Sequence, residues 1–72
     1  MATPIEKAQQ VVEFIEETFG ERLFEVTRDD AVGVWFDSAD GSLAVNISYD
    51  DIEDLPDSLS EIAVRVTTAH LP

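Results

Sequence analysis

The chain has 72 residues, with sixteen acidic against four basic side chains and a formal net charge of −12 at pH 7. We expect one small domain over residues 1–72, because a chain this short buries only about 60% of the surface that its unfolded form exposes. Cysteine is absent, which excludes disulfides and thiolate metal sites. A hydrophobic content of 44% is ordinary for a folded domain.

No apolar run approaches the ~18 residues that indicate a membrane span. The first residues, Met-Ala-Thr-Pro-Ile-Glu, lack the basic region and apolar run of a signal peptide. We therefore expect a cytoplasmic protein. Anionic lipid and nucleic acid phosphates repel a strongly acidic surface, so we expect no membrane contact and no direct nucleic acid binding.

The first element is predicted to be a helix over 4–19. Thr3 is the expected N-cap, Pro4 suits the first helical position, and Glu6 completes a capping box with Thr3. Gly20 stands where a C-cap glycine belongs. Apolar residues at helical spacing form the expected core stripe: Ile5, Ala8, Val12, Ile15 and Phe19.

Three runs of alternating polarity then predict an antiparallel meander with one buried face, at Arg22 to Arg28, Ala31 to Asp37 and Ser42 to Tyr49. Asp29-Asp30 and Ser38–Gly41 supply the connecting turns. The side chains expected to face the core are Phe24, Val26, Val32, Val34, Phe36, Leu43, Val45, Ile47 and Tyr49.

The last third of the chain fits two interpretations. Residues 50–60 carry repeated helix-start signals, and the meander needs a covering layer, so we favour a C-terminal helix. Residues 62–68 also alternate and are rich in β-branched types, which leaves a fourth strand as the alternative. The predicted fold class is α+β, in the order α-β-β-β-α. The apolar face of the C-terminal helix comprises Leu55, Leu59, Ile62, Ala63 and Val66.

Catalytic chemistry is not indicated. The one histidine, His70, lies two residues from the end of the sequence given, where chains commonly fray. There is no glycine-rich phosphate loop and no cysteine nucleophile. The stretch Asp37–Gly41 superficially resembles a calcium loop, but it lacks the alternating acids and the closing Glu of an EF-hand. We expect no enzyme activity, no cofactor and no metal site.

The acidic residues are concentrated in a window without bases. Ten acids and no Lys or Arg lie between Arg28 and Arg65. Turn roles explain four of them: Asp29, Asp30, Asp37 and Asp40. The remaining six exceed what a helix start needs, because acids there are favoured by the macrodipole by only ~0.3–1 kcal/mol each and repel one another. These six are the predicted partner-binding residues: Asp50, Asp51, Glu53, Asp54, Asp57 and Glu61.

Two aromatic residues are predicted to complete this surface. Trp35 falls on the sheet face opposite the helices, among small and polar residues. Phe14 lies off the core stripe of the first helix, while Val11 sits at its margin. A large exposed aromatic side chain is a common interface anchor. The small-residue sheet face around Trp35 would also suit a homodimer.

The expected function is a non-enzymatic, acidic protein-binding module. Regularly spaced carboxylates could occupy the basic groove of a nucleic-acid-handling protein, since the attraction of that groove for DNA rests largely on the same charges. Small antagonists encoded by phages share this combination of size and charge. The alternative is an accessory subunit or homo-oligomer whose acidity serves solubility or adaptation to high salt.

Overall fold

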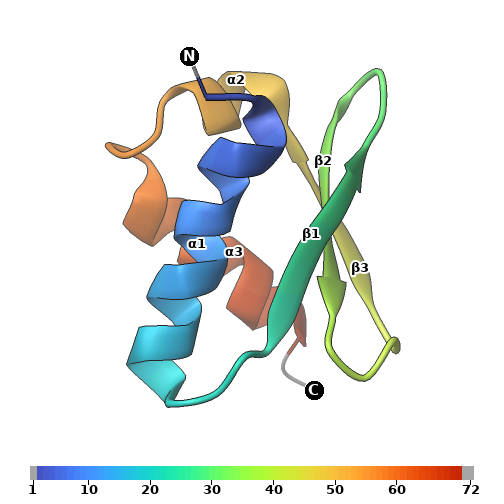
Figure 1. Ribbon diagram of the computed structural model, residues 1–72, viewed down its shortest axis with the longest axis vertical. Helices are drawn as coiled ribbons and strands as arrows, with labels where there is room; N and C mark the ends of the chain where they lie inside the picture. The colour runs from blue at the N-terminus through green and yellow to red at the C-terminus, as the bar shows by residue number, and fades with distance from the viewer. Residues whose placement is uncertain (1, 71–72) are drawn as a thin grey trace.

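The computed structural model describes residues 2–70, with the side chains of 2–69. A helix is followed by a three-stranded antiparallel sheet in the order β1-β2-β3 and then by two helices (Figure 1). This confirms the predicted α+β class, and the alternative of a strand at 62–68 is wrong because these residues are helical. The elements are α1 (Pro4–Phe19), β1 (Phe24–Asp29), β2 (Gly33–Ser38), β3 (Ala44–Ser48), α2 (Tyr49–Glu53) and α3 (Leu59–His70).

The ends of α1 follow the predicted capping. Thr3 Oγ1 accepts a hydrogen bond from the Glu6 amide at 3.1 Å, and Glu6 Oε1 accepts one from the Thr3 amide at 3.4 Å. Pro4 occupies the first helical position. The C-cap Gly20 has a φ of 78°, which a side chain would strain, so the helix ends there.

The strands are shorter than the alternation predicts. Asp30 Oδ1 accepts hydrogen bonds from the amides of Val32 and Gly33, at 2.8 and 2.9 Å. These bonds hold the chain in a turn until β2 begins at Gly33, and Val32 is therefore 66% exposed. Tyr49 likewise leaves the sheet to begin α2. The predictions of Val32 as a core residue and of Tyr49 as a strand residue are wrong.

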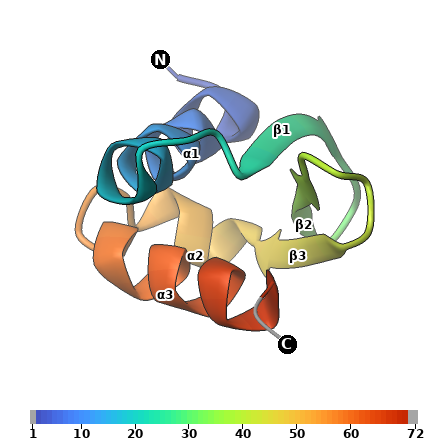
Figure 2. The same cartoon turned by 90° about the horizontal axis from the view of Figure 1, so that it is seen from below.

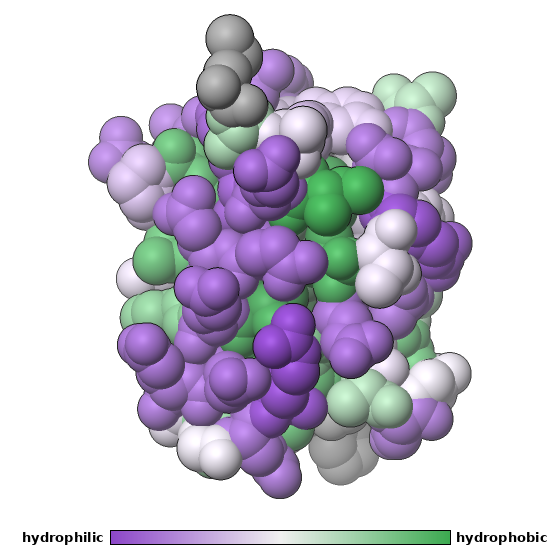
Figure 3. Space-filling model, in the orientation of Figure 1, coloured by the Kyte–Doolittle hydropathy of each residue, from purple (hydrophilic) through white to green (hydrophobic). Residues whose placement is uncertain are grey.

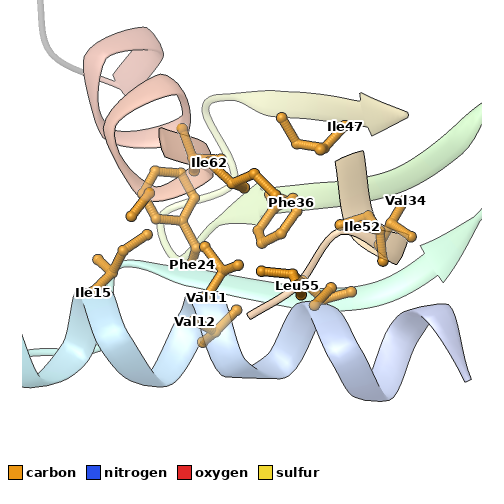
Figure 4. Close-up of a cluster of buried hydrophobic side chains, with 14 residues drawn as sticks. Val11, Val12, Ile15, Phe24, Val34, Phe36, Ile47, Ile52, Leu55 and Ile62 are labelled. Carbon is orange, nitrogen blue, oxygen red and sulfur yellow. The ribbon is translucent and has the colours of Figure 1, made fainter. Parts of the chain in front are cut away.

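The core lies between the helices and one face of the sheet (Figure 2). Side chains from α1, all three strands, α2 and α3 meet there (Figure 4). At about 1.5–3 kcal/mol for each large apolar side chain fully buried, this cluster supplies most of the drive to fold. The largest fully buried side chains are Phe24, Phe36, Ile15, Ile47, Ile52, Ile62, Val11, Val12, Val34 and Val66.

The core face of α1 differs from the predicted stripe at three positions. Val11 is completely buried rather than marginal, because α1 is covered both by the sheet and by α3 and its apolar face is correspondingly broad. Phe14 is half-buried and packs against the core cluster, so its placement off the stripe is wrong. Phe19 was expected in the core but is 55% exposed at the last position of the helix.

The acidic region forms two helices separated by a turn at 54–58, where one helix was expected. Pro56 lacks an amide hydrogen and disfavours helical geometry in the residue before it, so a helix is interrupted there. The Ser58 hydroxyl then donates to the Asp51 carbonyl at 2.8 Å, which fixes α3 relative to α2. Within the part of the chain described, no helix is long and apolar enough to cross a membrane.

Candidate protein-binding surfaces

The six predicted acidic residues follow one another through α2, the turn and the start of α3. Within residues 2–69, five of them make no ion pair and no side-chain hydrogen bond, and all five are exposed. Their carboxylates are therefore not neutralised by any described part of the chain. These five residues, named here the acidic segment, are Asp50, Glu53, Asp54, Asp57 and Glu61.

Asp51 has a different environment. Its Oδ2 accepts from Arg65 Nη1 at 2.9 Å and from the Ser48 hydroxyl at 3.1 Å. The hydrogen bond from Arg65, followed by that from Ser48, holds the pKa of Asp51 below its usual range. This carboxylate links the end of β3, α2 and α3, so the structure places Asp51 in an internal contact rather than with the acidic segment.

The other arginines are also engaged with acids. Arg22 lies 3.5 Å from Glu16, and Arg28 lies 2.9 Å from Asp37. Asp37 belongs to β2, so its role is an ion pair on the sheet rather than the turn role that was expected. All three arginines are thus directed to carboxylates outside the acidic segment, although Asp51, the partner of Arg65, lies between Asp50 and Glu53 in the sequence.

Trp35 lies on the sheet face away from the helices, as predicted, while its neighbours Val34 and Phe36 are buried on the other face. The guanidinium of Arg28 sits 4.8 Å from the centre of the indole ring, within cation–π range. The indole Nε1 donates to Asp30 Oδ2 at 2.8 Å. The indole is therefore half-buried by contacts within the chain, which leaves less of it for a partner than the sequence suggests.

The carboxylates of Asp29 and Asp30, beside Trp35, both accept hydrogen bonds from other parts of the chain. The amide of Gly33, then the indole of Trp35 and the amide of Val32, hold the pKa of Asp30 low. The Tyr49 hydroxyl lies 2.9 Å from Asp29 Oδ2 and also hydrogen-bonds to the Asp30 carbonyl. These contacts join the β1–β2 turn to the start of α2. Asp30 lies in the turn as predicted, whereas Asp29 is the last residue of β1, where it pairs with Val34.

Phe14 lies in an apolar groove between α1 and α3. The groove has a volume of about 140 Å³. Val64, which is 61% exposed, and Phe19 are the apolar side chains that sequence reasoning missed at this surface. The sequence signal that could have found Val64 is its position directly after Ala63, which places an apolar residue beside the predicted core face of α3. The lining residues, named here the α1–α3 groove, are Phe14, Ile15, Thr18, Phe19, Ala63, Val64 and Thr67.

The predicted residues thus fall on two sides of the molecule. Phe14 and the acidic segment belong to the helical side, and Glu61 stands on the same helix as Val64. Trp35 lies across the sheet from them. In Figure 3, hydrophilic residues cover most of the side on which α1 is in front, with apolar residues visible between them. Of the acidic segment, Glu61 is thus the residue that shares a helix with the groove around Phe14, while Trp35 lies on the opposite face of the sheet.

Metal-ligating side chains are not gathered within residues 2–69. No set of three or more His, Cys, Asp or Glu side chains among them is placed to hold a metal ion. In the stretch with some likeness to a calcium loop, Asp40 instead accepts from the Ser42 amide at 3.0 Å and from the Ser38 hydroxyl at 2.8 Å. The side chain of His70 lies outside the described residues.

No protein-family model matches the chain, and no curated protein or solved structure matches it either.

Proposed function

We propose that this chain is a non-enzymatic, acidic protein-binding module that inhibits or regulates a nucleic-acid-handling protein by occupying its basic groove. The observation that carries the proposal is the acidic segment, whose five carboxylates are exposed and have no partner within the described residues. Nothing in capping chemistry requires so many acids there. A basic partner would relieve their mutual repulsion.

Charge geometry supports a protein partner over a nucleic acid or membrane partner. Side chains three or four positions apart on a helix lie about 5–6 Å apart, so Asp50 and Glu53 of α2 are close neighbours. The turn at 54–58 and the start of α3 continue this exposed negative array with Asp54, Asp57 and Glu61. Such an array repels phosphates and anionic lipid. A groove lined by Lys and Arg to hold DNA would attract it for the same electrostatic reason. The proposal places the protein in the cytoplasm with that partner.

Affinity capture from a nuclease-treated native lysate at low and high salt tests the proposal. We expect a protein with a nucleic-acid channel to be retained at low salt and released at high salt. Added duplex DNA should compete with this chain for that protein. Asp50, Asp54 and Asp57→Asn together should weaken binding about 3- to 140-fold, at about 0.2–1 kcal/mol for each exposed ion pair.

Glu13, Glu21 and Glu25→Gln provide the matched control. Both triple variants change the formal charge from −12 to −9, and all six acids are exposed. The control should bind like the unmodified protein. Binding that is indifferent to salt, or equally weakened in both variants, would contradict a specific role for the acidic segment.

A homodimer through the sheet face around Trp35 is less well supported. Part of the indole surface is already covered by Arg28, and two copies would each bring a charge of −12. If the acidity is instead an adaptation to high salt, the protein should unfold at low ionic strength. Circular dichroism of the protein at low salt checks this alternative.

A further inference from the structure

The α1–α3 groove is an apolar surface that the chain leaves partly open. Its floor includes the buried residues Ile15 and Ala63. Its sides include Phe19 and Val64, which are 55% and 61% exposed. A domain of this size has few apolar side chains to spare for solvent, and exposed apolar surface rimmed by polar residues is typical of binding sites.

Acidic residues flank both walls of the groove. Glu17 follows Phe14 by three positions on α1, and Glu61 precedes Val64 by three positions on α3, so each acid is the helical neighbour of a lining residue. No basic side chain lines the groove in the described part of the chain. Arg65 is bound to Asp51. An occupant must therefore combine an apolar centre with a basic border.

The dimensions favour one inserted side chain. A volume of about 140 Å³ is close to the ~150 Å³ of an apolar cavity that holds benzene. The walls are two helices, and a third helix can pack its ridge of side chains into the groove between two others. A second copy of this chain would bring another −12 charge against the same acidic border. A helix with one basic face avoids that repulsion.

We infer that the α1–α3 groove binds a basic amphipathic helix of the partner protein, which inserts one leucine- or phenylalanine-sized side chain between Phe14 and Val64. This inference rests on the proposed function, since it specifies how the basic partner is held. The acidic segment attracts the basic side chains of the helix, and the groove fixes the position of the helix along α1 and α3. Binding therefore depends on both charge and apolar contact.

An 18-residue Lys/Leu peptide with leucines at i, i+3, i+4 and i+7 is the probe, and the same peptide with every Leu changed to Ser is its control. Titrations followed by amide NMR should show shifts at Thr18, Phe19, Ala63, Val64 and Thr67 with the Lys/Leu peptide. Val64→Glu should weaken its binding at least about tenfold, since an apolar contact is lost and the new carboxylate would have to give up its water against the inserted leucine.

Val32→Glu is the matched variant, because Val32 is 66% exposed but lies in the β1–β2 turn outside the groove. It should bind the Lys/Leu peptide like the unmodified protein, and circular dichroism should show that both variants remain folded. Equal affinity for the two peptides, equal loss in both variants, or shifts confined to the sheet face would overturn the inference. In those cases the acidic segment would still stand as a charge-based site.

Failure of both peptides to bind would contradict the proposed basic partner as well. Sedimentation of the free protein tests whether a second copy of this chain occupies the groove instead. A dimer that Val64→Glu dissociates would assign the groove to another copy of this chain and so refute the inferred helix.

Discussion

Replacing Gly33 with alanine should destabilise the protein more than any other glycine substitution within the described residues. A Cβ at Gly33 would lie 2.1 Å from the Ile47 carbonyl oxygen, 2.7 Å from the Ile47 carbonyl carbon and 2.8 Å from the Ser48 Cα. All three atoms belong to the backbone of β3, which cannot rotate away as a side chain would. To reach ordinary contact at 3.4 Å, β3 must move by more than 1 Å, because the closest atom is at 2.1 Å.

That displacement breaks ladder hydrogen bonds between β2 and β3, where Gly33 pairs with Ser48 and Val34 with Ile47. Two lost bonds at about 0.5–1.5 kcal/mol each, together with about 1–3 kcal/mol of overpacking strain, give a loss of about 2–6 kcal/mol. A chain of this length is expected to have a total stability of about 4–11 kcal/mol. The loss is therefore a large share of the total.

Urea denaturation followed by circular dichroism measures this effect. With a slope near 1 kcal/mol per molar urea, the midpoint should fall by at least about 2 M. Gly41→Ala is the control, because its added Cβ meets no atom within 4 Å and only its φ of 77° is unfavourable, at about 1–2 kcal/mol. A Gly33→Ala variant as stable as Gly41→Ala would refute the close approach of β2 and β3.

Two further predictions concern internal contacts of acidic residues. Arg65 and Ser48 lower the pKa of Asp51 in the folded protein. The ionised carboxylate therefore adds its full contribution to the free energy of unfolding above the ordinary carboxyl pKa of about 3.9, and this contribution is lost as the pH falls through the lower native pKa. Asp51→Asn should thus cost about 0.2–1 kcal/mol in urea unfolding at pH 7 and have no effect below the native pKa, whereas a difference that is the same at pH 7 and pH 2 would contradict the ion pair. Asp30→Asn places an amide against the Trp35 indole N–H that now donates to Asp30 Oδ2, so the tryptophan emission should shift to the red; an unchanged spectrum would show that this bond does not hold the ring.

Local signals predict α1 well because they act within a few residues. The capping box, the proline at the first position and the C-cap glycine all depend on neighbouring backbone groups. The buried face is less predictable, because it depends on what packs over the helix. Val11 is buried because α3 and the sheet both cover it, which no local pattern in α1 contains, and Phe19 is exposed at the end of the helix.

Turn chemistry explains the errors in the strands. Alternation continues through Val32 and Tyr49, yet the side chain of Asp30 binds two successive amides and draws Val32 into the turn. Tyr49 is drawn toward the same turn by its hydroxyl contacts with Asp29 and Asp30. Side-chain hydrogen bonds of this kind compete with the ladder and are not visible in a polarity pattern.

Part of the candidate surface could be predicted and part could not. Excess charge at 50–61 is a property of composition, so the acidic segment follows from the sequence. The internal role of Asp51 requires Arg65, which is fourteen positions away, to approach it. Val64 becomes notable only when α1 and α3 are placed side by side (Figure 2).

Gln9 has a consequence for the free edge of the sheet. Its side-chain amide donates to the Val26 carbonyl at 3.0 Å, within the stretch of β1 where the register shifts between Glu25 and Arg28. An incoming strand from another molecule would need regularly spaced backbone acceptors, and here one is already taken and the spacing is irregular. Gln9→Ala would free that carbonyl. Through Gln9, α1 therefore also disfavours the pairing of β1 with a strand of another molecule.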